Sequence, residues 1–225
     1  MRGFFITFEG IEGSGKSTQI EILAHHLLRE GHKVVTTREP GGTAFGEQIR
    51  RVLLSIKNRR LDTRAELFLY LASRTQHLEE VILPALKKGT IVLCDRFSDA
   101  TLAYQGFGRR LDMNIVRAAV DYAAKGLIPD LTLLLDLDVG VGLNRVRDRG
   151  RSNRMDREQR EFHQRVRAGY RRLARTEPGR IKIVEASQTP EDVAKDVKMM
   201  VDRRLVRRPV AKQNERGFHV VRSRF

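Results

Sequence analysis

The sequence contains few of the residues that mark secreted or membrane-spanning proteins. It has one cysteine, Cys94, and no tryptophan among 225 residues, and one cysteine cannot form an intrachain disulfide. No apolar run approaches the roughly 18 residues of a membrane-spanning helix, and no charged-then-apolar signal segment precedes Phe4. We therefore expect a cytoplasmic protein without a membrane segment, long enough for one α/β domain.

Acidic residues are also scarce, and the excess positive charge is local. The chain has 28 Asp and Glu against 43 Lys and Arg, a net charge of +15. Residues 144–175 contain 12 arginines and four acidic residues, and residues 201–225 contain eight basic and two acidic residues. The remainder is nearly neutral. This distribution argues against a nucleic-acid partner, which a continuous basic surface would favour.

Residues 10–17, with the sequence GIEGSGKS, match the phosphate-binding P-loop pattern. They lie between the apolar run 4–8 and a helical pattern, the context that a P-loop requires. The glycines let backbone N–H groups converge on phosphate oxygens. Lys16 can bridge the terminal phosphates, and the Ser17 hydroxyl can bind a Mg²⁺ cofactor. We therefore predict a nucleoside triphosphate site formed by Gly10, Glu12, Gly13, Ser14, Gly15, Lys16, Ser17 and Thr18.

Strand and helix patterns alternate along the chain, which predicts an α/β protein. The predicted strands cover residues 4–8, 34–37, 90–94, 131–137 and 181–185. A P-loop after the first strand predicts a P-loop NTPase fold: a five-stranded parallel sheet with helices on both faces, in three αβα layers. Ligands should then lie beyond the carboxyl ends of the strands.

Three arginines are candidates for binding a second phosphate at that edge. Arg38 and Arg96 follow predicted strands, and Arg74 lies on the predicted helix 63–88. Planar guanidinium groups bind a dianionic phosphate bidentately. An ordinary solvated position is the alternative for each of them.

Several segments, in this order, resemble bacterial thymidylate kinases with a basic lid. They are Phe8-Glu9-Gly10 leading into the P-loop, Thr37-Arg38-Glu39-Pro40-Gly41-Gly42-Thr43, Asp95-Arg96-Phe97, Ala103-Tyr104-Gln105-Gly106 and Asp156-Arg157-Glu158. The resemblance covers about residues 3–200. It implies phosphoryl transfer from ATP to dTMP, giving dTDP and ADP for dTTP biosynthesis, by a homodimer that uses Mg²⁺. We expect one nucleoside monophosphate kinase domain over residues 1–208.

The resemblance also implies roles for individual residues. Lys16 and Arg96 are implied to be catalytic, and Ser17 and Asp95 to lie at the metal. Tyr70 is expected to stack on thymine, although its apolar neighbours also allow a core position. The implied dTMP site contains Glu12, directed at the 3′-hydroxyl, with Arg38, Tyr70, Arg74, Arg96, Thr101, Tyr104 and Gln105. Where the family usually has serine before Thr101, this chain has Ala100, which weakens the expected contacts with the base.

One branch of the family carries a basic residue inside the P-loop, at the position of Gly13. Because this chain lacks it, we predict that a lid at about residues 149–157 supplies the cations, through Arg149, Arg151 and Arg154. The basic tail 209–225 is expected to be disordered or to lie on the surface. Two other functions stay open: a kinase for another (deoxy)nucleoside monophosphate or deoxynucleoside, and a nucleic-acid-dependent P-loop ATPase.

Overall fold

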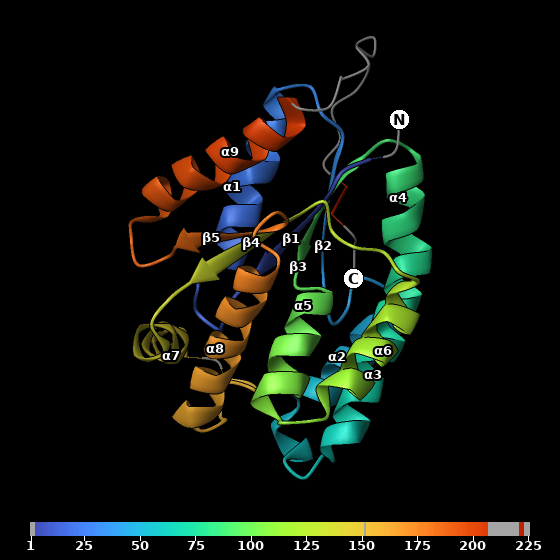
Figure 1. The fold of residues 1–225 in the computed structure, drawn as a ribbon, viewed down its shortest axis with the longest axis vertical. Helices are drawn as coiled ribbons and strands as arrows, with labels where there is room; N and C mark the ends of the chain where they lie inside the picture. The colour runs from blue at the N-terminus through green and yellow to red at the C-terminus, as the bar shows by residue number, and fades with distance from the viewer. Residues whose placement is uncertain (1–2, 151, 207–220, 223–225) are drawn as a thin grey trace.

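The computed structural model describes residues 3–150, 152–206 and 221–222. Its centre is a parallel sheet in the order β5-β4-β1-β3-β2-β6 (Figure 1). The strands are β1 (Phe5–Glu9), β2 (Val34–Arg38), β3 (Ile91–Asp95), β4 (Leu131–Asp136), β5 (Ile181–Glu185) and β6 (Val221–Arg222). The five predicted strands are confirmed. The two-residue strand β6, which pairs with β2 and forms the edge of the sheet, was not predicted; the rest of the predicted tail lies outside the described residues.

One face of the sheet is covered by two helices, α1 (Lys16–Arg29) and α9 (Pro190–Val206). Phe4, Ile6 and Phe8 alternate along the first strand and pack with apolar side chains of these helices. The period-two alternation of a strand places all three on the same face. This core carries the P-loop between β1 and α1.

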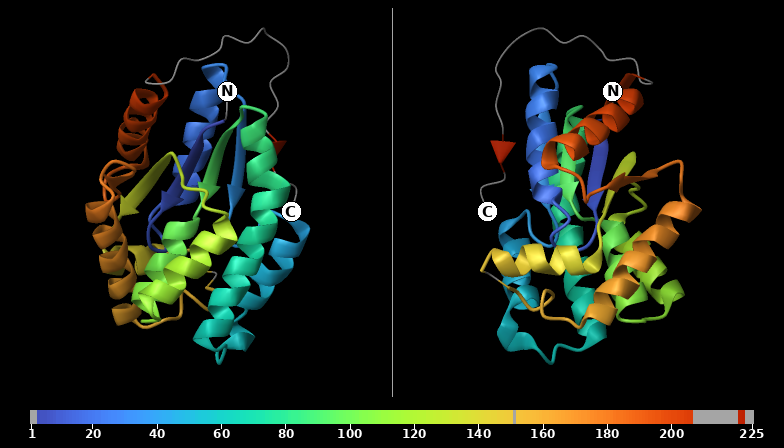
Figure 2. Two further views of the ribbon diagram at one scale, coloured as in Figure 1. Left: turned by 45° about the vertical axis from the view of Figure 1, so that its right-hand side comes forward. Right: turned by 90° about the vertical axis from the view of Figure 1, so that its left-hand side faces the viewer.

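The opposite face is covered by a larger set of helices (Figure 2). They are α3 (Thr63–His77), η2 (Leu78–Ile82), α4 (Leu83–Lys87), α5 (Ser98–Thr101), η3 (Leu102–Gly108), α6 (Met113–Ala124) and α8 (Arg160–Thr176). Phe5 of β1 points to this side and meets Phe97 edge to face, with ring centroids 5.0 Å apart. Outside this layer, α2 (Ala44–Leu54) packs on α3, and η1 (Ile56–Asn58) follows it. Helix α7 (Val139–Asp148) packs on α8.

Two helical segments differ from the predicted pattern. The predicted helix 63–88 is present, but it passes through the π-helical turn η2 just before Pro84. The wider turn accommodates a residue that lacks an amide hydrogen, so the helix continues. The helix formed by α5 and η3 was not predicted, because it is short and mostly π-helical and has no clear 3.6-residue apolar period.

The carboxyl ends of the central strands meet at one edge of the sheet. Residues Glu9, Arg38 and Asp95 end β1, β2 and β3 there. The P-loop, the start of α5 and the turn before α2 follow from the same edge. Within the described residues, no helix combines the length and the apolar character needed to cross a bilayer.

Candidate active site

The P-loop joins β1 to α1 through glycines with positive φ. Gly10, Gly13 and Gly15 have φ angles of 135°, 74° and 89°, values that side chains with a Cβ rarely adopt. A Cβ built on Gly15 would have no other atom within 4 Å. The buried Lys16 Nζ donates hydrogen bonds to the carbonyl oxygens of Gly10 and Ile11, at 3.1 and 2.9 Å. The loop therefore combines a cation, open space and a helix N-terminus, which is the arrangement that binds phosphate.

Helix α7 lies directly against the P-loop. A Cβ on Gly13 would stand 2.3 Å from the carbonyl oxygen of Gly142, and a Cβ on Gly142 would stand 2.5 Å from that of Glu12. Neither position has room for a side chain unless the backbone moves. The absence of a basic residue at position 13 thus has a local steric reason in this fold.

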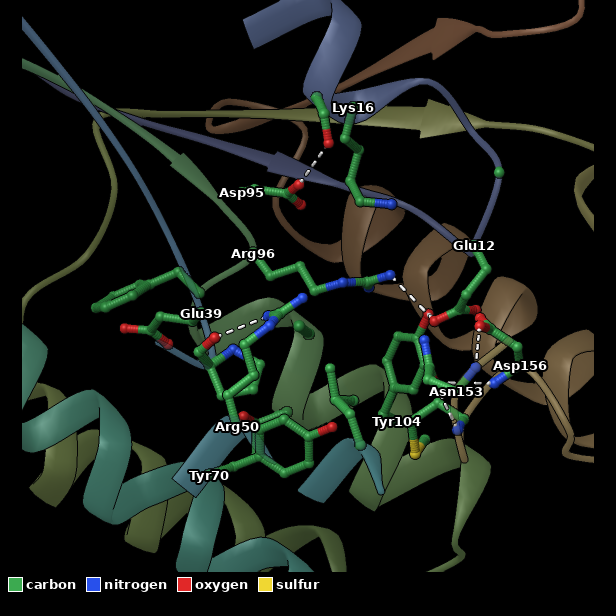
Figure 3. Close-up of a pocket in the computed structure, with 18 of the residues that line it drawn as sticks. Glu12, Lys16, Glu39, Arg50, Tyr70, Asp95, Arg96, Tyr104, Asn153 and Asp156 are labelled. Atoms are coloured by element: carbon green, nitrogen blue, oxygen red, sulfur yellow. Dashed lines mark hydrogen bonds and ion pairs between the residues drawn. The ribbon is translucent and has the colours of Figure 1, made fainter. Parts of the chain in front are cut away.

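The residues at the start of α1 and the end of β3 suit Mg²⁺. Ser17 Oγ lies 3.2 Å from Asp95 Oδ2 (Figure 3). The other carboxylate oxygen, Asp95 Oδ1, is buried and has no hydrogen-bond partner among the described residues. These are hard oxygen ligands. The described residues contain no cluster of three His, Cys, Asp or Glu for an all-protein metal site, so a Mg²⁺ ion here would depend on nucleotide phosphates and water for its other ligands.

Glu12 of the P-loop faces away from Lys16, toward η3 and α8. Its Oε1 accepts hydrogen bonds from the Tyr104 hydroxyl at 2.6 Å and from Arg96 Nη2 at 3.1 Å. On the other side, His163 Nδ1 lies 3.3 Å from Oε2. Burial alone would raise the pKa of Glu12, but Arg96 and His163 outweigh burial and hold the pKa well below its usual range. Glu12 is therefore an anion that can accept a hydrogen bond from a hydroxyl group.

Arg96 links the two halves of the site. It has a φ of 71° at the end of β3, and its Nη1 donates to the Gly10 carbonyl oxygen at 3.0 Å. The guanidinium also stacks over the Tyr104 ring, 4.8 Å from its centroid. Burial and the neighbouring Arg96 lower the pKa of Lys16 to about 8. Two cations are thus held close together, which favours an anionic ligand between them.

A single cavity of about 290 Å³ connects the P-loop to a pocket between α3 and η3 (Figure 3). Seven of the predicted dTMP-binding residues line it: Glu12, Tyr70, Arg74, Arg96, Thr101, Tyr104 and Gln105. The eighth, Arg38, is not among the lining residues; its half-exposed side chain pairs with Glu47 at 3.0 Å. Burial, followed by the charge of Glu66, raises the pKa of Tyr70 to about 12.

Arg74 is the most deeply buried of the candidate arginines. Its Nε donates to Glu39 Oε2 at 2.8 Å, and its Nη2 donates to the Phe97 carbonyl oxygen and to Thr101 Oγ1, both at 2.9 Å. The remaining nitrogen, Nη1, is buried and has no hydrogen-bond partner among the described residues. Arg74 is therefore not an ordinary solvated surface residue, which was the alternative for each candidate arginine. Ala100, at the position where serine was expected, also lines the cavity.

The predicted lid arginines occupy different environments. Arg149, at the end of α7, is exposed and lines the cavity. Arg151 lies outside the described residues. Arg154 is buried and directed away from the cavity: its Nε donates to the Leu53 carbonyl oxygen at 2.7 Å, and its Nη2 is 2.6 Å from Glu66 Oε2. Of the two predicted lid arginines that the structure describes, Arg149 and Arg154, only Arg149 lines the cavity.

The cavity residues missing from the predicted site include three with polar side chains that could reach a ligand: Arg50, Asn153 and Asp156. Arg50 Nη1 donates to the Pro40 carbonyl oxygen at 2.8 Å. Its sequence signal was weak, because it stands on an amphipathic helix where arginine is ordinarily solvated. Asn153 and Asp156 form a turn, in which the backbone N–H of Asn153 donates a hydrogen bond to Asp156 Oδ2 at 2.8 Å. The motif that contains Asp156 indicated the lid but gave no reason for its carboxylate to face inward.

Comparison with known proteins agrees with this geometry. The sequence model of the thymidylate kinase family matches residues 8–197. The thymidylate kinase of Desulfovibrio desulfuricans is 53% identical over 211 residues, covering 91% of this chain and 97% of that protein. That of Trichlorobacter lovleyi is 53% identical over 207 residues, covering 89% and 98%. The crystal structure of thymidylate kinase from Ehrlichia chaffeensis matches with a TM-score of 0.73 at 35% identity, covering 90% of this chain and 99% of that one. The predicted resemblance and the P-loop NTPase fold are confirmed, and the chain belongs to the thymidylate kinase family.

Proposed function

We propose that the protein transfers the γ-phosphoryl group of ATP to dTMP, giving ADP and dTDP for dTTP biosynthesis. The observation that carries this proposal is the shared cavity, which runs from the P-loop to a buried pocket for a base. The donor and acceptor phosphates can therefore lie next to each other in this cavity, with no protein segment between them. Holding both in one water-poor space is the main contribution a protein makes to phosphoryl transfer.

The polar groups of the base pocket favour thymine. Arg74 Nη1 is a buried donor without a partner among the described residues, and Gln105 lines the same cavity with its amide nitrogen already bonded to Glu66. Thymine presents the complementary pair, an O4 acceptor next to an N3–H donor, whereas cytosine presents the reverse. A wrong base would leave buried groups unpaired, which is costly. We assign Tyr70 to stacking on the base and Glu12 to the 3′-hydroxyl.

Charge stabilisation is assigned to residues on three sides of the phosphates. We assign Lys16 to the donor phosphates, Arg96 with Arg50 to the acceptor phosphate, and Arg149 to the closing lid; the acceptor-phosphate role of Arg38, which does not line the cavity, stays a prediction. The role of Arg151 stays a prediction. When Mg²⁺ is held by Ser17 and Asp95, it neutralises charge on the triphosphate.

A homodimer is the proposed assembly. Helices α2, α3 and α6 lie side by side and carry large apolar side chains that are exposed in the single chain: Phe45, Phe68, Ile115 and Tyr122. A contiguous exposed apolar face of this kind marks a protein interface. Light scattering should give twice the chain mass, and Phe68→Asp should give the monomer mass. A monomeric wild-type protein would exclude this assembly. The cytoplasmic location stays a prediction.

The test of the function is a panel of monophosphates with ATP and Mg²⁺. We expect dTMP to have the highest kcat/KM, and ADP formation to depend on its presence. Clear preference for dCMP, dGMP or UMP would assign the chain to another monophosphate. ATP hydrolysis that requires DNA or RNA, and that is lost as salt rises, would favour the nucleic-acid-dependent ATPase.

A further inference from the structure

A buried carboxylate on α3, Glu66, connects the base pocket to the lid turn, which we define as residues 152–159 between α7 and α8. Glu66 is fully buried. Its Oε1 accepts hydrogen bonds from Gln105 Nε2 at 2.9 Å and from Arg109 Nε at 3.0 Å. Its Oε2 accepts from Arg109 Nη2 at 3.0 Å and lies 2.6 Å from Arg154 Nη2. Three side chains, two from η3 and its end and one from the lid turn, thus converge on Glu66.

The carboxylate determines which end of the Gln105 amide faces the cavity. An ionised carboxylate can only accept hydrogen bonds, so the Gln105 atom beside it has to be the NH₂ group. A glutamine amide is otherwise nearly symmetrical in shape and can turn over. Burial alone would raise the pKa of Glu66, but Arg109 and Gln105 hold it below its usual range, so the carboxylate stays ionised. The amide oxygen is therefore the end of Gln105 that remains for a ligand.

The same carboxylate anchors the lid turn. Arg154 belongs to the turn, and its backbone N–H also donates to the Leu54 carbonyl oxygen at 3.0 Å. Arg109 joins Glu66 to Glu158 at the end of the turn, at 2.6 Å. Arg109 also stacks over the Phe162 ring of α8, 4.6 Å from its centroid. The turn that places Asn153 and Asp156 in the cavity is thus fixed through Glu66.

We propose that Glu66 is a positioning residue with two effects: it orients Gln105 to accept a hydrogen bond from the base, and through Arg154 it holds the lid turn over the acceptor. This inference rests on the proposed dTMP kinase function. It makes Glu66 a determinant of base selectivity although it does not line the cavity. It also accounts for a lid arginine that points away from the phosphates.

The decisive variant is Glu66→Gln, tested for kcat/KM with dTMP and with dCMP. A glutamine at position 66 has the same shape but offers either a donor or an acceptor, so the Gln105 amide is free to turn over. We expect the dTMP-to-dCMP ratio of kcat/KM to fall about tenfold or more, since base-edge hydrogen bonds carry the discrimination. A merely structural role would lower both values together and leave the ratio unchanged, which would overturn the proposal.

Arg154→Met is the matched control, because it removes the lid anchor but leaves the contact between Glu66 and Gln105. We expect it to keep the dTMP-to-dCMP ratio, to lower kcat with dTMP and to expose the lid turn to proteolysis. If Glu66→Gln does not fold, the double variant Glu66→Gln/Arg154→Met removes the arginine left without a carboxylate, and its ratio is compared with that of Arg154→Met. An equal ratio in these two variants overturns the orienting role, and a protease-resistant Arg154→Met turn overturns the anchoring role.

The wild-type measurement separates the two proposals. A wild-type protein without activity on dTMP would end the proposed function and leave the selectivity ratio undefined. A wild-type protein that prefers dTMP, together with a Glu66→Gln variant of unchanged ratio, would keep the function and reject only the role of Glu66.

Discussion

The P-loop and the lid turn lie on the same cavity but are built in opposite ways. The P-loop is a backbone structure: glycines with positive φ and one lysine shape it within eight consecutive residues. The lid turn is a side-chain structure, held by ion pairs to Glu66 and Arg109 from other elements. The first is fixed by local sequence, whereas the second depends on partners more than 40 positions away. Changes to the P-loop should therefore affect phosphoryl transfer and the backbone conformation. Changes to the lid turn should affect the ion pairs that hold it.

The largest effect is expected from Lys16→Ala. Losing one preorganised cation at the transferred phosphoryl group typically costs about 3 kcal/mol of transition-state stabilisation, or roughly 10²-fold in kcat. The fold should persist, because burial already disfavours the charged form of this lysine and lowers its pKa to about 8. Steady-state kinetics measures kcat, and a thermal melt shows whether the fold persists. Near-normal kcat would show that the P-loop does not act on phosphate.

The next effect concerns the backbone fit of the P-loop, tested by Gly13→Ala. The new Cβ would meet the Gly142 carbonyl oxygen at 2.3 Å, and φ is 74°. We expect a loss of about 2–4 kcal/mol in the free energy of unfolding in urea, from strain and overpacking together. Gly31→Ala is the matched control, since its φ is 82° and no atom lies within 4 Å; it should cost about 1 kcal/mol. An equal loss of unfolding free energy in the two variants would contradict the steric explanation for Gly13.

The two described lid arginines should differ in their effect on stability, although both variants should lower kcat. Arg154→Met deprives the buried Glu66 of one cation and should lower the free energy of unfolding by about 1–3 kcal/mol. Arg149→Met changes an exposed side chain, so stability should stay within about 0.5 kcal/mol while kcat drops. Denaturation curves and kinetics on both variants make the comparison. If Arg149→Met is the destabilising change, our assignment of the two roles is reversed.

A further prediction is a pH dependence of stability that originates at Glu9. Burial, reinforced by Asp99, raises the pKa of Glu9 to about 8 from an ordinary value of 4.5. Between these values the unfolded carboxyl has lost its proton and the folded one keeps it, so stability falls as pH rises through this window and then levels off. Glu9→Gln should remove this slope in urea unfolding measured at about pH 5, 6.5 and 8. If the free energy of unfolding falls equally with pH in the wild-type protein and in Glu9→Gln, Glu9 is not the origin of the pH dependence.

The same contrast explains how much of the molecule the sequence could predict. The five strands and the P-loop have local signatures, and the family motifs indicated Tyr104 and Gln105. The roles of Glu66 and His163 could not be predicted, because each depends on a partner distant in sequence, Arg109 and Glu12 respectively. Arg50 contacts Pro40 nearby in sequence, but an arginine on an amphipathic helix is ordinarily solvated, so its pattern gave only a weak signal. A buried Glu66 looks like an ordinary solvated residue until the fold brings arginines to it.

Arg154 illustrates the limit of reasoning from charge alone. Counting arginines in this segment predicted a basic lid, but a count cannot tell a cation that faces phosphate from one that neutralises a buried carboxylate. Both uses need the same residue type in the same segment. Only the direction of the side chain, set by Glu66 and the Leu53 carbonyl oxygen, separates them.

The contact between Gly13 and Gly142 has an evolutionary consequence. Because each Cβ position is already occupied by the other segment's backbone, the effect of a substitution at one position depends on where the other segment lies. A basic residue at position 13 would become tolerable only after α7 had moved, and such a movement would also displace Arg149, which directly follows α7. The two ways of supplying a cation are therefore alternatives separated by an unfavourable intermediate, and no single substitution converts this enzyme from one to the other.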